Sequence, residues 1–274
     1  MGFRINSNIE AVNAHRSLLV NSSRLSKSME RLSSGLRINK ASDDAAGLAI
    51  SEKLRSQVRG IGQAVRNAQD GISLLQTAEG ALYETNNILQ RMRELAVQAA
   101  NDTLTAGDRS SIQKEIDSLL SEVNRIASST QFNSRNLLDG SAATTALNFQ
   151  VGANTGQTIA VTIATATAAA LTITGISVGS TSLANDAVAS LDSAITEVSN
   201  IRAGLGAIQN RLEHTIANLG TASENLQASE SRIRDVDMAM EMVNFTKLQI
   251  LQQAGTSVLA QANVTPQSVL KLLS

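Results

Sequence analysis

The chain has 274 residues, of which 42% are hydrophobic and 17% are charged, so it carries enough apolar sequence to build a core. It contains no Cys, no Trp, one Tyr and four Phe, which excludes disulfides and thiolate metal sites and disfavours a wide core of aromatic rings. Narrow seams of aliphatic residues between helices are favoured instead. A net charge of −1 with interspersed signs leaves no basic face for nucleic acid.

The first segment, to about Leu36, carries apolar residues at steps of three and four, the spacing of a helix that packs on another helix. These residues form two offset seams, which indicate one helix that changes its partner along its length. The seam residues are Ile5, Ile9, Val12, Leu25, Met29, Leu32 and Leu36. We expect Gly35 to end this helix, and Ser42-Asp43-Asp44 to supply a capping side chain and first-turn carboxylates for the next.

A much longer helix is predicted over Ala45 to Ala100, where an apolar seam runs without proline or an interrupting charge. At about 1.5 Å per residue, this helix would be roughly 80 Å long. Each glycine inside it costs about 1 kcal/mol relative to alanine. We expect close approach of neighbouring helices to compensate, with bends at some glycines as the alternative. The glycines are Gly47, Gly60, Gly62, Gly71 and Gly80.

Two further helices complete the predicted bundle. After a turn with the capping signature Thr105-x-x-Asp108, a helix on Ile112 to Ile126 would run antiparallel to the long one. Helical periodicity returns from Val188 to Leu226, which predicts the third helix of the bundle.

Residues 140–185 differ from the rest because they contain no charged side chain. The pieces LNFQV and TIAVTI, separated by GANTGQ, predict two short strands and a connecting turn, whereas the fold of residues 164–185 stays open. We interpret this stretch as a small surface insertion without chemistry. O-linked sugar on its hydroxyls is an alternative that no motif decides.

The final segment, Phe245 to Ser274, has only Lys247 and Lys271 as charges and is again amphipathic. Thr265-Pro266 fits an N-cap followed by proline at the first helical position, which predicts a last short helix. Both chain ends therefore carry more apolar surface than one narrow bundle can cover, and we expect copies of the chain to bury it in an assembly. The C-terminal residues predicted to make this contact are Phe245, Leu248, Leu251, Val258, Leu259, Leu270 and Leu273.

No catalytic, cofactor-binding or metal site is predicted. His15 and His214 each lack a second ligand at helical spacing, and the nucleotide-binding and nucleophile-elbow motifs are absent from the sequence. The N-terminus has no continuous apolar run of the kind found in a Sec signal peptide. The sequence therefore predicts a non-enzymatic, mainly α protein: an elongated antiparallel helical bundle or coiled coil with a small β-hairpin insertion and paired terminal helices.

Several long motifs resemble bacterial flagellin. They are MERLSSGLRINKASDDAAGLAISEKLRSQVRG, NAQDGISLLQTAEGAL, QRMRELAVQAAN, TQFNSRNLLDG, NRLEHTIANL and SRIRDVDMAMEM. The resemblance implies five segments: an N-terminal helix and connector of an inner core domain, a rod of two antiparallel helices, a variable insertion, a C-terminal rod helix, and C-terminal helices of the inner core domain. Their bounds are 1–42, 43–139, 140–185, 186–232 and 233–274.

The resemblance also implies a function. Flagellins polymerise into the extracellular filament used for swimming, are exported through the flagellar type III apparatus, and bind an export chaperone, cap proteins and hook-associated proteins. No cofactor, nucleic acid or membrane partner is implied. A hook–filament junction protein is the alternative within the family, and a membrane-active secreted helical protein is the alternative outside it, because the amphipathic ends would also suit a lipid surface.

One motif implies a further partner. In flagellins similar to this chain, the positions within and near QRMRELAVQ are recognised by the flagellin-sensing Toll-like receptor of animal hosts. The matching residues here are Arg91, Glu94, Leu95, Gln98 and Glu115. A role in filament contacts is the alternative, and both roles are compatible.

Overall fold

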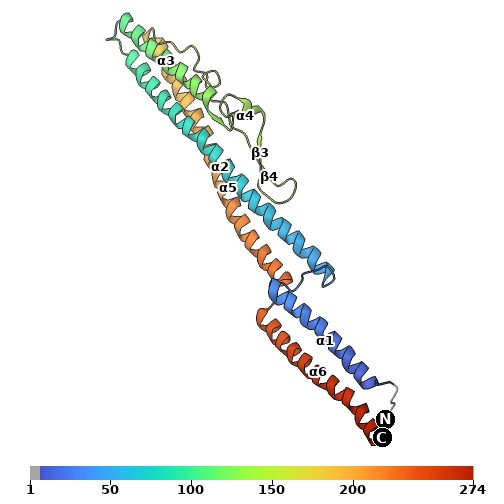
Figure 1. Ribbon diagram of the computed structural model, residues 1–274. Coiled ribbons are helices and arrows are strands. Elements are labelled where there is room, and N and C mark those ends of the chain that lie inside the picture. Colours follow the sequence, from blue (N-terminus) through green and yellow to red (C-terminus); the bar gives the residue numbers. More distant parts are fainter. Residues whose placement is uncertain (1–6, 274) are drawn as a thin grey trace. The chain divides into compact units, whose positions relative to one another are not determined.

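The computed structural model describes residues 7–273, and side-chain surroundings within residues 7–264. The chain divides into two compact units, one formed by both chain ends, through Ser56 and from Asn225, and the other formed by Gln57–Glu224. We call them the terminal unit and the central unit. The secondary structure is dominated by helices, as expected (Figure 1).

In the terminal unit, α1 (Ile9–Ser34) and α6 (Met238–Leu273) form an antiparallel pair (Figure 1). Gly35 ends α1 in the left-handed conformation, with φ 71°, and its N–H donates to the carbonyl of Arg31. The predicted end of the first helix is therefore confirmed, and so is the pairing of the terminal helices.

The connector between α1 and α2 (Ala45–Ala99) uses its two aspartates differently. Asp44 caps α2, because its Oδ1 accepts a hydrogen bond of 2.8 Å from the Gly47 N–H. Asp43 instead accepts hydrogen bonds from the N–H groups of Asn39 and Lys40 and pairs with Lys27 Nζ at 2.7 Å. Lys27 and these backbone donors lower the pKa of Asp43 to about 2.

The central unit is built on α2, α3 (Ala106–Ser129) and α5 (Thr181–Arg234). Both halves of the predicted capping box form at the start of α3: the Asp108 N–H donates to the Thr105 hydroxyl, and the Thr105 N–H donates to the Asp108 carboxylate. The third helix begins at Thr181, earlier than the periodicity from Val188 indicated.

Two hairpins and a short helix connect α3 to α5. The first hairpin consists of β1 (Gln131–Phe132) and β2 (Arg135–Asn136), where no strand was predicted from the sequence. It is followed by α4 (Ser141–Thr144) and by the second hairpin, β3 (Leu147–Gln150) and β4 (Thr158–Val161), which confirms the two predicted strands. Beyond β4, turns and irregular backbone lead to α5.

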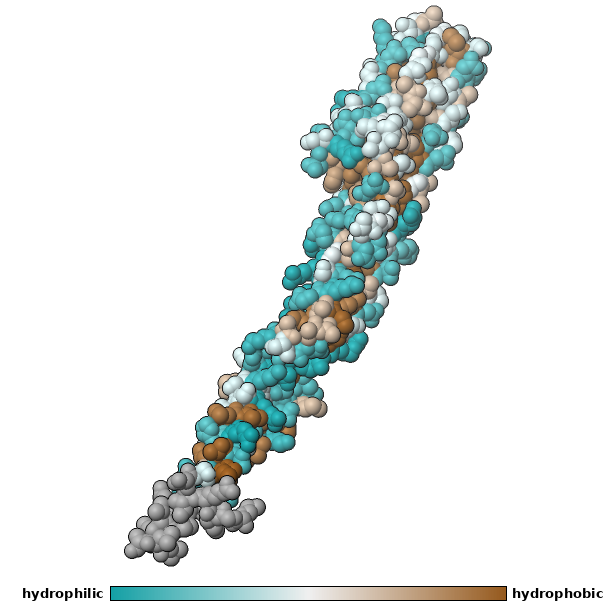
Figure 2. Space-filling view, turned by 90° about the vertical axis from the view of Figure 1, so that its right-hand side faces the viewer, coloured by the Kyte–Doolittle hydropathy of each residue, from teal (hydrophilic) through white to brown (hydrophobic). Residues whose placement is uncertain are grey.

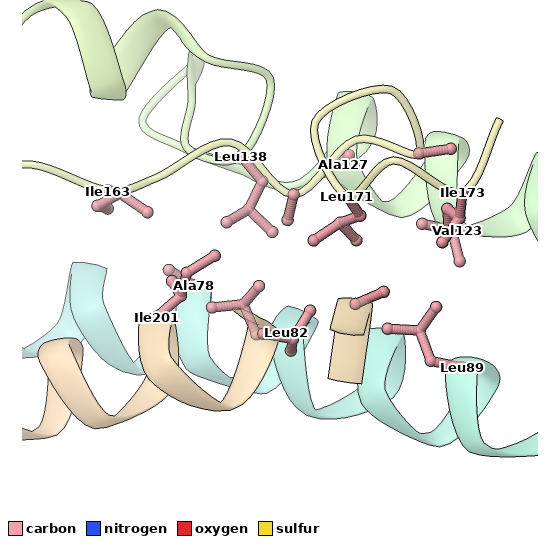
Figure 3. Packing of buried hydrophobic residues seen from close by; sticks show 14 of the residues in the cluster. Ala78, Leu82, Leu89, Val123, Ala127, Leu138, Ile163, Leu171, Ile173 and Ile201 are labelled. Carbon is pink, nitrogen blue, oxygen red and sulfur yellow. The ribbon is translucent and has the colours of Figure 1, made fainter. Parts of the chain in front are cut away.

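The interpretation of residues 140–185 as a surface insertion was wrong. Its aliphatic side chains, among them Ile163, Leu171 and Ile173, are buried in the same hydrophobic cluster as the three helices. Figure 3 shows these side chains and Leu138 facing Leu82 and other apolar residues of the helices below them. The segment lacks charges because it supplies part of the core.

Polar side chains of α3 hold the irregular part of this segment in place. Gln113 accepts from the Val178 N–H at 2.8 Å and donates to the Ile176 carbonyl at 3.0 Å. Asn124 Oδ1 accepts from the Ala168 N–H at 3.0 Å. These bonds satisfy backbone groups that no strand partner satisfies, so the segment packs closely without regular secondary structure.

The explanation of the α2 glycines also needs correction. A Cβ added at Gly60 would lie 2.9 Å from the Cβ of Ala153, and one added at Gly71 would lie 3.2 Å from the Phe149 ring, so the β3–β4 hairpin makes the close approach, not a helix. At Gly62 and Gly80 nothing lies within 4 Å of an added Cβ. At these two positions the chain leaves open space.

The prediction of a separate last helix at Thr265-Pro266 was wrong, because α6 continues through these residues to Leu273. Proline has no N–H to donate to the carbonyl four residues before it, which here is that of Ala262. The Asn8 side chain donates a hydrogen bond of 2.8 Å to this carbonyl. A partner outside the helix therefore supplies a donor where the proline cannot.

A candidate assembly surface on the terminal helices

The inner faces of α1 and α6 form a heptad seam. Buried and half-buried residues recur at steps of three and four in each helix. In α1 they are Ala11, Ala14, Leu18, Asn21, Leu25, Ser28 and Leu32, and in α6 they are Glu241, Phe245, Leu248, Gln252, Gly255, Leu259 and Ala262. Gly255 gives Leu18 room, because an added Cβ would lie 3.2 Å from the Leu18 Cδ1. The seam is narrow and partly polar.

One buried carboxylate marks the register of this seam. Glu241 is 8% exposed, and its carboxylate accepts a hydrogen bond of 2.5 Å from the Ser28 hydroxyl. Arg31 lies 3.8 Å from the other carboxylate oxygen. A buried carboxylate is stable only with such partners. If one helix slid along the other, Glu241 would lose Ser28 and Arg31 and would lie against an apolar neighbour.

The outer faces of the same two helices expose aliphatic side chains. Each of these residues is between 41% and 70% exposed. We call this set the terminal apolar face, and it consists of Ile9, Val12, Leu19, Val20, Val243, Ile250, Leu251, Val258 and Val264. Figure 2 shows hydrophobic surface gathered on this part of the molecule, next to the grey atoms. Because the seam joins the inner faces, the two outer faces point away from each other, and exposed apolar surface of this extent is typical of a protein-contact surface.

The structure separates the residues that the sequence grouped as one assembly set. Some line the seam within the pair and are half-buried: Leu25, Leu32, Phe245, Leu248 and Leu259. Others are exposed: Ile9, Val12, Met29, Leu251 and Val258. Leu36 is half-buried in the connector, where it bridges to Asp235. Ile5 and the side chains of Leu270 and Leu273 lie outside the described residues.

Five exposed members of the terminal apolar face were missed by sequence reasoning: Leu19, Val20, Val243, Ile250 and Val264. In α6 the signal was present, because Val243 and Ile250 are seven residues apart and thus share a helix face. That face could be found only once the seam through Phe245 and Leu248 was assigned to the partner helix.

The residues expected to contact a host receptor form an ion-pair cluster on α2 and α3 of the central unit. Arg91 lies 3.1 Å from Glu94 and 3.0 Å from Glu115. Glu115, followed by Glu94, raises the pKa of the Arg91 guanidinium above its usual value. Gln98 is exposed beside them, whereas Leu95 is only 2% exposed and packs in the core below. Leu95 therefore supports this surface and does not form part of it.

Arg109 is a structural residue that sequence reasoning missed. Its guanidinium donates to the carbonyls of Ala99 and Asn101, each at 3.0 Å, and to the hydroxyl of Thr181 at 3.1 Å. The same hydroxyl donates to the carboxylate of Asp102 at 2.8 Å. One cation therefore binds the carbonyl of the last α2 residue and a carbonyl of the following turn, and it ties both to the start of α5.

Paired terminal helices with an unburied apolar face, together with a helical central unit, define a class of self-assembling helical subunits. No helix in the described part of the chain is long and apolar enough to cross a membrane. The family model for the bacterial flagellin N-terminal helical region matches residues 5–143, and that for the C-terminal helical region matches residues 188–273. The chain belongs to the bacterial flagellin family.

Individual relatives agree over nearly the whole chain. A flagellin of Halalkalibacterium halodurans is 54% identical and one of Bacillus subtilis is 52% identical, each over 98% of this chain and 99% of the relative. The flagellar filament 33 kDa core protein of Treponema phagedenis is 51% identical with the same coverage. The crystal structure of Bacillus cereus flagellin, at 36% identity, covers 56% of this chain and 88% of that chain with a TM-score of 0.50.

These findings establish the function at the level of the assembly. The protein is a structural subunit that polymerises into the bacterial flagellar filament, which lies outside the cell and serves motility. The relatives are named as flagellins and filament core proteins, which supports the filament subunit and neither alternative, the hook–filament junction protein or the membrane-active protein.

Proposed function

We propose that copies of this flagellin pack against one another through the terminal apolar face. The observation that carries this proposal is the imbalance between the two units. Among the described side chains, only Ile38 and Ala262 are buried hydrophobic residues of the terminal unit, whereas the central unit has a continuous cluster from Ala68 to Leu212. Burial of the exposed residues between copies would supply the apolar contact that the pair lacks.

A substitution on the outer face of α6 tests this proposal. Ile250→Gln should leave the helical content of the monomer unchanged, because the side chain is exposed, and should raise the critical concentration for polymerisation about tenfold or more. Leu183→Gln is the matched control, since Leu183 is exposed on α5 of the central unit. Equal critical concentrations for wild type and Ile250→Gln would refute the proposed surface.

Removal of both chain ends is the stronger test. A chain lacking residues 1–30 and 245–274 should remain a helical monomer, because the hydrophobic cluster lies within the central unit. Electron microscopy would detect any filaments that this doubly truncated chain forms. Filament growth would show that the terminal helices are dispensable for assembly.

The same exposed α6 face suits the other flagellar partners. We propose that before assembly it is covered by the export chaperone, and that cap and hook-associated proteins contact the terminal helices in the filament. The aliphatic side chains exposed on α6, such as Val243 and Ile250, are suited to an apolar groove. Ile250→Gln should therefore weaken copurification of the chaperone, whereas Leu183→Gln should not. In this proposal the role of the protein is structural and not catalytic.

We further propose that the cluster of Arg91, Glu94, Gln98 and Glu115 is read by the flagellin-sensing Toll-like receptor. Its exposure and its alternating charges support this assignment. Arg91→Ala should lower receptor binding about fivefold or more, because a cation that meets the receptor is lost together with its two ion pairs. Arg125→Ala, which removes a comparable exposed pair with Glu122 on α3, should bind like wild type. Full binding by Arg91→Ala would refute this contact.

A further inference from the structure

Four of the six methionines gather at one level of the α1–α6 pair. Met29 directly follows Ser28, and Met238, Met240 and Met242 lie within three residues of Glu241, the residue that Ser28 contacts. All four are between 46% and 66% exposed, whereas Met92 is fully buried in the central unit. We call these four residues the methionine cluster.

The composition of the chain makes these thioethers the main target for a two-electron oxidant. The chain has no cysteine, which would otherwise react first, and no tryptophan. In a copy that has not yet packed against others, these thioethers are exposed, so an oxidant reaches them before assembly. Exposure decides which methionines react, so the cluster should react and Met92 should not.

We propose that the methionine cluster is a sulfoxidation site that controls assembly of the terminal helices. In the reaction, a sulfur lone pair attacks one oxygen of hydrogen peroxide, the O–O bond breaks and an S–O bond forms. The sulfur is oxidised by two electrons, the peroxide is reduced, and water leaves. The inference rests on the proposed packing of copies through the terminal unit.

The physical consequence follows from the change in polarity. A thioether is apolar and flexible and packs well against varied partners, whereas a sulfoxide is polar and carries a strong hydrogen-bond acceptor. Beside the cluster, α6 exposes the aliphatic Val243 together with the polar Asn244 and Thr246. Packing of copies over an oxidised cluster would remove water from the sulfoxide oxygens, and each oxygen that meets an apolar side chain of the neighbouring copy is left without a donor, which disfavours assembly.

The test begins with full-length monomer treated with dilute hydrogen peroxide. Peptide mass spectrometry should find sulfoxide at Met29, Met238, Met240 and Met242 and unmodified Met92. The critical concentration for polymerisation should rise about tenfold. Treatment with methionine sulfoxide reductases A and B should restore the original value, which excludes irreversible damage as the cause.

Two variants separate the cluster from other effects of peroxide. A variant with leucine at all four positions should polymerise without peroxide and keep its critical concentration after treatment. Met92→Leu, the control, should stay as sensitive as wild type. Unchanged assembly of fully oxidised wild type, or equal sensitivity of the four-leucine variant, would overturn the inference. Failure of the untreated wild-type chain to polymerise would instead overturn the proposed function on which the inference rests.

Discussion

The side-chain amide of Asn8 joins the first turn of α1 to the carbonyl oxygen of Ala262 in α6, over a distance of 2.8 Å. The same side chain caps α1, because its Oδ1 accepts from the Ala11 N–H at 3.0 Å. Ala262 stands four residues before Pro266, which cannot donate to it. One residue thus begins the first helix and compensates for a proline in the last.

Asn8→Ala should destabilise the terminal helix pair by about 1–2 kcal/mol, because both the cap and the bond to Ala262 are lost. The measurement is hydrogen exchange of the α1 and α6 amides. Asn8→Ser is the matched control, since serine keeps the cap but has no amide donor. In a Pro266→Ala background, where an N–H returns, the Asn8→Ala loss should be smaller. Equal losses in both backgrounds would rule out the compensation.

Ser28→Ala should weaken the pair by about 1–3 kcal/mol, because the buried carboxylate of Glu241 loses a hydrogen-bond donor. Ser26→Ala is the control, because the Ser26 hydroxyl is exposed and bonds only to the carbonyl of its own helix at Ser22. Thermal unfolding followed by circular dichroism compares the two. A Ser28→Ala protein as stable as Ser26→Ala would show that this contact does not hold the helices in register.

The stability of the connector should depend on pH because of Asp43. Its folded-state pKa of about 2 lies below the ordinary value of 3.8, so Asp43 contributes stability that is fully present above about pH 4 and is lost as the pH falls toward 2. An NMR titration should follow this carboxyl, and Lys27→Met should raise its pKa, because Lys27 is the main cause of the shift. An unchanged Asp43 titration in Lys27→Met would contradict the assignment.

The effect on stability of replacing an α2 glycine by alanine should depend on the space around that glycine. Gly62→Ala and Gly80→Ala should stabilise the monomer by about 1 kcal/mol each, because alanine is the better helix former and nothing opposes its Cβ. Gly60→Ala should not, because its Cβ would press on Ala153. Denaturant unfolding measures the difference. Equal stabilisation at Gly60 and Gly62 would show that the β3–β4 hairpin does not rest on α2 as described.

The local signals in the sequence were sufficient to predict the helices, their caps and the second hairpin. Apolar residues at steps of three and four, Gly35, the Thr105–Asp108 box and the LNFQV and TIAVTI strands each act through neighbours within a few residues. Such features depend little on the rest of the chain, and the long shared motifs were likewise enough to identify the family.

Other properties depended on contacts between distant residues. Ile9 and Leu25 are both aliphatic and both lie on α1, yet only the position of α6 decides which one is exposed. Ile163 is buried because α2, α3 and α5 leave a place for it, and Leu95 is buried although it stands one turn from Arg91. Asn8, more than 250 residues earlier, donates to the Ala262 carbonyl to which Pro266 cannot donate. Periodicity determines that a helix has faces, but only the neighbours packed on it determine which face remains free for other copies.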